Sequence, residues 1–342
     1  MSINYALGYD HITLNQPRLT TVHSRTECDT SITFGPRTFK VPVVPANMAC
    51  TISPKLGKQL AMNGYFHILH RFGSSNYKTL QEYRSAQNGI TTYDSVSIGV
   101  KFADYEFIDE LISNEILVDY ITIDVAHGHS IQVIKMLEYI KRNYPTAFVI
   151  AGNVATPQAV TDLENAGADA IKVGIGPGKA CTTFLKTGFM SPMFTTVYNC
   201  AQVAKVPIIA DGGIRSNGDI VKALVAGADM VMVGSMFAQL IDSPAETIYT
   251  FKNEPWYMKL VNLLTFTPQK NTGFKKAFYG SASEHNKDHN NNIEGTLVYL
   301  DGINMTYLNK MNEIQQDLQS AISYAGGVNL SILPTTKYDI IM

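Results

Sequence analysis

ENAGADAIKVGIG, from Glu164 to Gly176, recurs along the chain as ALVAGADMVMVGS, from Ala223 to Ser235. The four letters Ala-Gly-Ala-Asp alone would be explained as a good turn between a helix and a strand. The match is longer than that turn, because Val173 and Gly174 recur as Val233 and Gly234 at the same offset. A repeated helix–turn–strand unit of this kind predicts a barrel assembled from duplicated pieces.

Eight short runs, continuously apolar rather than alternating, are typical of parallel strands that are covered on both faces. They begin near Val41, Phe66, Ser95, Tyr120, Ala147, Ala170, Val206 and Met230. Segments that read as amphipathic helices separate them, and such alternation indicates right-handed βαβ units. Eight units predict an α/β fold of the (β/α)8 TIM-barrel type, and a doubly wound sheet is the alternative that needs fewer strands.

Two of the intervening helices carry clear end signals. Residues 130–143 place Ser130 as an N-cap and an apolar face on one side, formed by Ile131, Ile134, Leu137 and Ile140. The next helix has Thr156 as its cap and Pro157 at its first position, and it ends on Gly167.

Composition favours one large globular unit. Apolar residues make up 45% and charged residues 16% of the 342 residues, and the formal net charge is −2. We therefore expect a single domain over residues 1–342, with no nucleic-acid surface and no membrane span. The start of the chain does not resemble a secretory signal. The four cysteines are far apart, which predicts neither a disulfide framework nor a zinc site and favours a cytoplasmic location.

The regular alternation stops after Ser235. We expect residues 241–301 to form an irregular flap or insert, in which segment 253–274 has no assignable role and 285–292 is a polar tract. A last helix is expected over residues 310–324, before Gly326 and Gly327, and a surface arm from Val328 onward.

Loops at the carboxyl ends of barrel strands build the active site in this fold. After the sixth run, GIGPGKACTT presents Cys181 in a glycine-rich loop, which favours a reactive thiol over a buried apolar residue. Asp211-Gly212-Gly213 and Gly234-Ser235 end the next two runs, and together they favour phosphate binding by backbone N–H groups. The fourth run ends in Asp124.

The chain resembles the family of IMP dehydrogenases and GMP reductases in motifs that span nearly its whole length. These motifs are HSRTECD, NMACTIS, IDVAHGHS, AGNVATPQA, GIGPGKACTT, IIADGGIRSNGDI, MVMVGSMFA and QQDLQSAISYAGG. The reductase branch is favoured because only a short loop separates Arg71 from Thr79, where the dehydrogenases usually carry a regulatory insert. The chain also contains no Arg-Tyr pair for activating water. An IMP-dehydrogenase-like enzyme without the insert is the alternative, and a non-catalytic nucleotide-binding barrel is a third possibility.

The resemblance implies NADPH-dependent reductive deamination of GMP to IMP and ammonia. Cys181 would be the covalent nucleophile, and Thr183 and Glu294 would handle the proton for ammonia release. Asp211 would hold the ribose hydroxyls. The other implied substrate-binding residues are Gly212, Gly213, Gly234, Ser235, Gly280, Ser281 and Gly295.

The resemblance also implies which residues bind the cofactor and a cation, and how the subunits assemble. The implied cofactor-binding residues are Ser24, Arg25, Arg71, Asp124, Ala126, Ile209, Ala210 and Ser323. Ser24 and Arg25 resemble a pair that reaches the cofactor of a neighbouring subunit, which implies a homotetramer. Carbonyl groups near Gly176, Gly178 and Cys181 resemble a site for a monovalent cation, potassium.

Overall fold

The computed structural model describes residues 6–16, 18–73, 76–85, 92–251, 271–280, 283–284 and 293–341. Three features of the sequence analysis therefore lie outside the described residues: Ser281, the polar tract 285–292 and most of segment 253–274.

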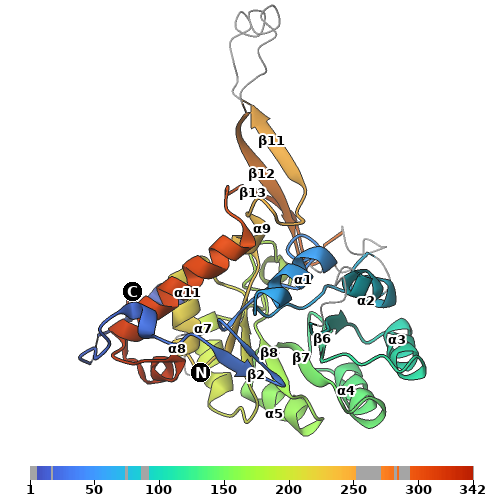
Figure 1. Cartoon of the computed structure of the whole chain (residues 1–342). Coiled ribbons are helices and arrows are strands. Elements are labelled where there is room, and N and C mark those ends of the chain that lie inside the picture. The colour runs from blue at the N-terminus through green and yellow to red at the C-terminus, as the bar shows by residue number, and fades with distance from the viewer. Residues whose placement is uncertain are drawn as a thin grey trace, which may run out of the picture.

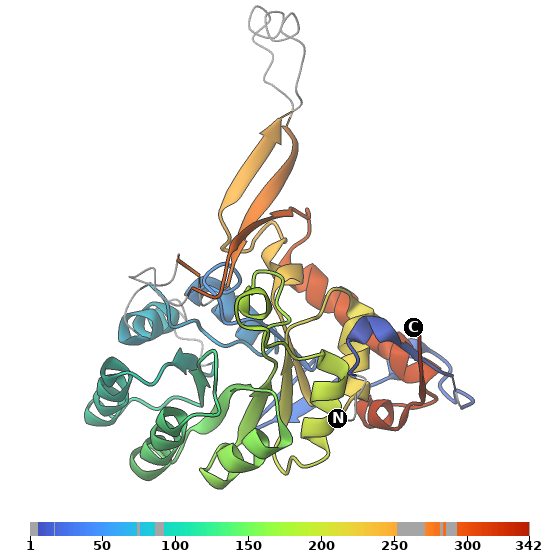
Figure 2. The same ribbon diagram turned by 180° about the vertical axis from the view of Figure 1, so that it is seen from behind.

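A curved sheet of seven parallel strands, in the order β4-β10-β9-β8-β7-β6-β5, forms the centre of the molecule (Figures 1 and 2). This arrangement confirms the barrel class. The strands are β4 (Val43–Pro45), β5 (Ser95–Ile98), β6 (Tyr120–Asp124), β7 (Phe148–Val154), β8 (Ala170–Val173), β9 (Ile208–Asp211) and β10 (Met230–Val233).

The run near Phe66 is not a full strand, in contrast to the prediction of eight. It contributes only an isolated parallel bridge, in which Leu69 pairs with Val96 of β5. One of its backbone N–H groups donates to a side chain and not to a neighbouring strand: the N–H of His67 donates to the Tyr93 hydroxyl at 2.9 Å. The same hydroxyl donates to the carbonyl of Tyr65 at 2.8 Å.

Helices follow the strands around the outside of the sheet (Figure 2). They are α1 (Pro54–Met62), α2 (Asn76–Ser85), α3 (Phe102–Ser113), α4 (Ile131–Asn143), α5 (Pro157–Asn165), α7 (Met193–Ala201) and α8 (Asn217–Val225). The predicted caps are confirmed, since the Ser130 side chain accepts from the N–H of Val133 and Thr156 from that of Ala159. The predicted apolar face of α4 was wrong at Ile131, which is 57% exposed; Val133 and Met136 are buried instead.

The sequence repeat corresponds to a repeated structural unit. Gly167 and Gly227 follow α5 and α8 with φ of +100° and +103°, a region that favours glycine, before β8 and β10 begin. The repeated aspartates have the same role in both copies. Asp169 accepts from the N–H of Val149 at 2.6 Å, and Asp229 accepts from that of Ile208 at 2.8 Å. Each unit therefore ties its helix–strand turn to the neighbouring strand.

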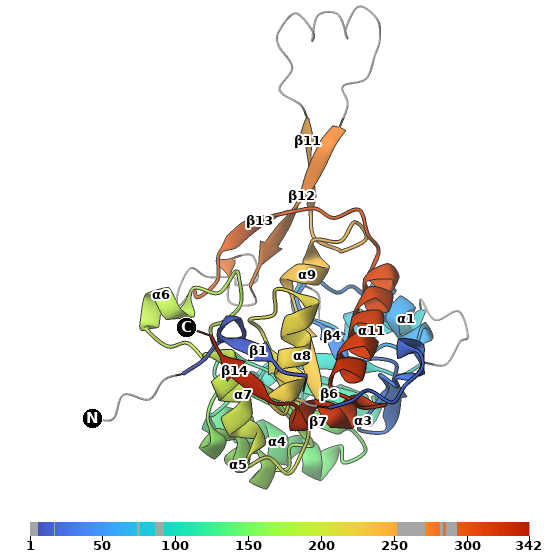
Figure 3. The same cartoon turned by 90° about the vertical axis from the view of Figure 1, so that its left-hand side faces the viewer.

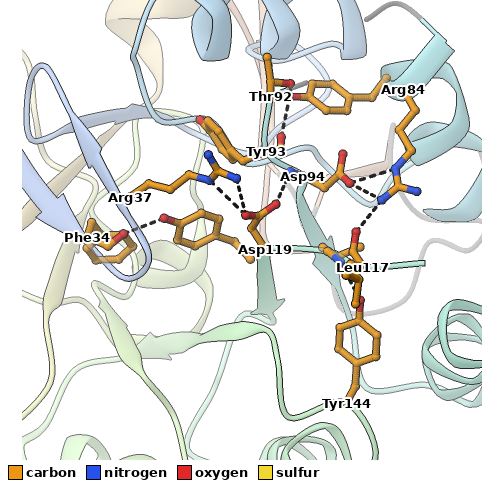
Figure 4. Close-up of polar contacts among 12 residues, drawn as sticks. Phe34, Arg37, Arg84, Thr92, Tyr93, Asp94, Leu117, Asp119 and Tyr144 are labelled. Carbon is orange, nitrogen blue, oxygen red and sulfur yellow. Dashed lines mark hydrogen bonds and ion pairs between the residues drawn. The ribbon is translucent and has the colours of Figure 1, made fainter. Parts of the chain in front are cut away.

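The amino end of the barrel is closed by a hairpin of β2 (Ile32–Phe34) and β3 (Arg37–Phe39). Phe34 and Phe39 are buried against Phe66, Tyr93 and Tyr120, an aromatic cluster at the bottom of the barrel. Figure 4 shows the polar network around this cluster, in which the Tyr120 hydroxyl donates to the Phe34 carbonyl at 2.7 Å.

Two ion pairs lie beside the hairpin in the same network (Figure 4). Arg37 donates to Asp119 at 2.8 Å, and Arg84 pairs with the buried Asp94 while also donating to the Leu117 carbonyl. Burial raises the pKa of Asp94, and Arg84 opposes this shift without cancelling it.

Residues 241–301 were predicted to be irregular, and for the described residues this was wrong. They contain an antiparallel sheet of β11 (Thr247–Phe251), β12 (Asn271–Tyr279) and β13 (Leu297–Asp301), which projects from one end of the barrel (Figures 1 and 3). Lys276 of β12 is buried and donates to the carbonyls of Ile241, Ser243 and Ala245, each at 3.2 Å. These three bonds fix the base of the projecting sheet to the chain that leaves β10 through α9 (Ser235–Ala238).

The C-terminal part also differs from the prediction. Helix α11 (Tyr307–Tyr324) begins earlier than expected because Thr306 caps it, accepting from the N–H of Asn309. The expected surface arm forms a 3-10 turn (Leu330–Thr335) and then β14 (Tyr338–Ile340), which pairs with β1 (Ile12–Leu14) (Figure 3). None of the helices among the described residues is long and apolar enough to cross a membrane.

The Arg84–Asp94 pair provides a test of this packing. We expect Arg84→Met to lower the free energy of unfolding by about 2 kcal/mol, because it leaves a buried carboxylate without a cation. The double variant R84M/D94N should lose less than R84M alone, since no uncompensated charge remains. Urea unfolding curves measure both values, and a double variant less stable than R84M would contradict this account.

Candidate active site

The cysteine loop, residues 174–182, leaves the carboxyl end of β8 and is held in shape at its base. Ser191 accepts from the N–H of Ile175 through its hydroxyl at 3.1 Å and donates its own N–H to the Ile175 carbonyl at 2.7 Å. Gly174 has φ of +144°, and a Cβ there would lie 2.0 Å from the Asp211 carbonyl oxygen. Only glycine therefore allows β8 and β9 to approach this closely at the loop.

The three side chains expected to be catalytic form one hydrogen-bonded chain. The Cys181 thiol lies 3.2 Å from the Thr183 hydroxyl, and that hydroxyl donates to Glu294 Oε2 at 2.7 Å. Thr183 begins the short helix α6 (Thr183–Thr187), while Glu294 comes from a segment more than a hundred residues later. The structure thus brings together residues that the sequence places far apart.

Backbone pairing puts Glu294 in this position. The glutamate segment, residues 293–296, pairs with the cysteine loop through an antiparallel bridge between Cys181 and Gly295. The N–H of Thr182 donates to the Glu294 carbonyl, and the N–H of Thr296 donates to the Ala180 carbonyl, both at 2.9 Å. Lys186 of α6 also donates to the Ile293 carbonyl.

A cavity of about 290 Å³ opens at the carboxyl ends of the strands, beside Cys181. Most of the expected site residues line it: Arg71, Asp124, Ala126, Gly176, Gly178, Cys181, Thr183, Asp211, Gly212, Gly280 and Glu294. Phe278 at the base of the projecting sheet lines it too, so the sheet forms one wall of the cavity.

Lys172, which lines the same cavity from β8, was not predicted from the sequence. Lys172 is 2% exposed, and its ammonium contacts Asp124 Oδ1 at 2.6 Å and Asp211 Oδ2 at 3.2 Å. The one indication of this residue in the sequence is a single lysine within the apolar run AIKVGIG.

Burial disfavours the charged form of Lys172, but attraction to Asp124 and Asp211 outweighs this effect and raises the pKa of the lysine. Burial likewise opposes ionisation of Asp124, yet Lys172 and Arg71 keep the pKa of that carboxyl lowered.

Asn153 of β7 is a second residue that the sequence analysis missed. Its amide donates to Asp211 Oδ2 and to the Gly174 carbonyl, both at 2.8 Å. Its own Oδ1 is buried at the cavity wall and has no hydrogen-bond partner among the residues that the structure describes.

The remaining expected site residues lie next to the cavity or away from it. Gly213 and Gly295 directly follow Gly212 and Glu294, which line it. Gly234 lies against Phe278 and Ala46 of the lining, and Ser235 is not among the lining residues. Ile209 and Ala210 are fully buried in β9 and do not line the cavity. Gly212 and Gly213 have φ of +97° and +78°. The N–H groups of Gly212, Gly213 and Ser235 have no hydrogen-bond acceptor within the described part of the chain.

Ser24, Arg25 and Ser323 form a separate group at the C-terminal end of α11. The Arg25 guanidinium donates to the Ser320 hydroxyl at 3.3 Å and to the Tyr324 hydroxyl at 3.1 Å. Ser323 is buried and shares a hydrogen bond with Thr20 at 3.2 Å. None of these three residues lines the cavity.

The three residues expected to bind potassium belong to the cysteine loop. The carbonyl of Gly178 accepts the N–H of Cys181 at 2.9 Å, which leaves one lone pair on that oxygen. Across the described ranges, no three His, Cys, Asp or Glu side chains are grouped as a metal site.

A (β/α)8 barrel with a cysteine–threonine–glutamate chain in a cavity at the carboxyl ends of its strands defines the class of the protein. The family model described as "IMP dehydrogenase / GMP reductase domain" matches residues 6–340. The chain therefore belongs to the IMP dehydrogenase/GMP reductase family, and it is an oxidoreductase.

Individual relatives agree with this assignment. A protein of Oceanobacillus iheyensis named GMP reductase is 46% identical over 332 residues, which cover 95% of this chain and 93% of that protein. The GMP reductase of Bacillus licheniformis is 46% identical over 322 residues, covering 94% and 91%. That of Staphylococcus aureus is 44% identical over 327 residues, covering 95% and 93%.

The close contact at Gly174 predicts a sharp difference between two glycines of the cysteine loop. We expect Gly174→Ala to destabilise the fold by about 3 kcal/mol, since its φ is unfavourable and its Cβ would meet backbone. Gly178→Ala is the matched control, because its Cβ would meet only Cys181 Cβ at 3.7 Å. Thermal unfolding compares them, and equal stability of the two variants would argue against the contact.

Proposed function

We propose that the protein is a GMP reductase, which converts GMP to IMP and ammonia at the expense of NADPH. The observation that carries this proposal is the chain from Cys181 Sγ through Thr183 Oγ1 to Glu294 Oε2. It joins a nucleophile to a proton-transfer pair within hydrogen-bond distance, which is the combination that removal of an amine from a purine carbon needs. The names of the relatives support the same activity.

The reaction divides into two steps at Cys181. In the first, the thiolate sulfur forms a bond to C2 of GMP, and the C2–N bond breaks. The departing amine takes up a proton through Thr183 and Glu294 and leaves as ammonia, so the product is a covalent thioimidate. NADPH, when bound, would supply a hydride to C2. The C–S bond would then break, with the Cys181 sulfur leaving as thiolate and IMP released.

Residues around the cavity fit the nucleotide. The unengaged N–H groups of Gly212, Gly213 and Ser235, with Gly234, would hold the phosphate. The Asp211 carboxylate would accept from the ribose hydroxyls. Gly280, Ser281 and Gly295 would border the base, the first at the cavity wall and the last paired with Cys181.

The cofactor side of the cavity also fits a nicotinamide. Arg71, Asp124 and Ala126 line it, and the unpartnered Asn153 Oδ1 is an acceptor suited to a carboxamide N–H2. The contacts of Ile209 and Ala210 with the cofactor, and those of Ser24, Arg25 and Ser323 across a homotetramer, stay predictions. Potassium at Gly176, Gly178 and Cys181, the cytoplasmic location and the single-domain organisation stay predictions as well.

Cys181→Ala should abolish turnover, because it removes the only thiol among the described residues that line the cavity. GMP binding should persist, since the phosphate and ribose contacts are unchanged. NADPH oxidation and GMP titration measure the two properties. The control is Cys28→Ala, at a buried cysteine outside the cavity. Near-normal turnover by C181A would remove covalent catalysis from the proposal.

Glu294→Gln should slow ammonia release by about 100-fold or more, since it removes the proton-transfer carboxylate. Hydride transfer should fall far less. Single-turnover formation of NADPH from IMP and NADP⁺, without ammonia, measures the hydride step alone. Equal losses in both steps would make Glu294 a positioning residue.

A further inference from the structure

We propose that Lys172 is a positioning residue that joins Asp124 and Asp211 into one charged unit and leaves a single oxygen of Asp211 free to bind the ribose. This inference rests on the proposed function, because it takes Asp211 as the ribose ligand.

The burial of Lys172 requires an explanation beyond stability. A lysine that is 2% exposed in a strand of apolar residues carries a large desolvation cost, which ion pairing with Asp124 and Asp211 offsets. An apolar side chain would fill the same place in β8 without that cost. The two carboxylates end β6 and β9, on either side of the cavity floor, so the lysine connects the cofactor side with the substrate side.

The two oxygens of Asp211 have different environments. Oδ2 accepts from both Lys172 Nζ at 3.2 Å and Asn153 Nδ2 at 2.8 Å. Oδ1 accepts no hydrogen bond among the residues that the structure describes, and Asp211 lines the cavity. Two donors on one oxygen fix the carboxylate plane, and the other oxygen is left for a ligand hydroxyl.

Loss of the ammonium should release Asp211 from this orientation. Asp124 and Asp211 would then repel each other without a cation between them, and Asn153 alone would hold Oδ2. The effect should fall on ligands that bind through the ribose hydroxyls and should spare ligands that lack them. A loss of affinity that is confined to ligands with ribose hydroxyls therefore distinguishes a positioning role of Lys172 from a general effect on the fold.

The test compares GMP with 2′,3′-dideoxy-GMP by calorimetric titration of wild type, K172M and K172R. We expect K172M to lose about 10- to 100-fold in GMP affinity and to bind the dideoxy nucleotide within about three-fold of wild type. K172R should recover most of the GMP preference, because its guanidinium can still donate to both carboxylates. Lys276→Met is the matched control: it removes another buried lysine, and it should lower stability while keeping the wild-type preference for GMP.

A K172M variant that keeps the wild-type preference for GMP, or that loses affinity for both nucleotides equally, would overturn the inference. If K172M does not fold, the same titrations are done with the variant D124N/K172M, which leaves one fewer carboxylate without its lysine partner. GMP turnover in the same wild-type preparation tests the proposed function separately. A hydroxyl preference that depends on Lys172 in a protein without GMP turnover would support the inference and refute the proposed function.

Discussion

An ammonium group that is shut off from water needs polar or anionic partners, and those of Lys172 come from the ends of two other strands. Lys172 on β8 pairs with Asp124 at the end of β6 and with Asp211 at the end of β9. In a parallel barrel, the carboxyl ends of the strands meet at one face, so a single side chain can reach both carboxylates. The ion pairs thereby set the distance between the two sides of the cavity and provide its polar floor.

The wall above that floor is built by a different part of the chain. The projecting sheet is anchored by Lys276, and it places Phe278 and Gly280 at the cavity. The glutamate segment then returns to pair with the cysteine loop, which puts the Glu294 carboxylate on the Thr183 hydroxyl. The groups that we propose to react are therefore assembled from two structural units, the barrel and the sheet that rises from it.

Much of the fold followed from local patterns in the sequence. The repeat around Asp169 and Asp229, and the caps Ser130 and Thr156, depend on residues close in sequence, and they were predicted correctly. Features decided by distant partners were not. Tyr93 interrupts the second strand through its hydroxyl, and β14 pairs with β1 across nearly the whole chain.

The candidate site shows the same division. Cys181 could be singled out from its glycine-rich loop, whereas Thr183 and Glu294 were assigned by resemblance alone. Lys172 and Asn153 were missed because their roles depend on contacts with residues of other strands. Lys172 contacts Asp124, and Asn153 donates to Asp211. Periodicity finds buried strands, but it does not reveal which charge on one strand faces which charge on another.

The covalent step at Cys181 is the central claim, and peptide mass spectrometry tests it most directly. The protein is incubated with IMP and NADP⁺ in the absence of ammonia, denatured, and digested to peptides. The account predicts that the peptide containing Cys181 gains the mass of IMP less two hydrogen atoms, the composition of a thioimidate, and that the C181A protein gains nothing. An unmodified Cys181 peptide together with accumulating XMP would contradict the account and favour a dehydrogenase.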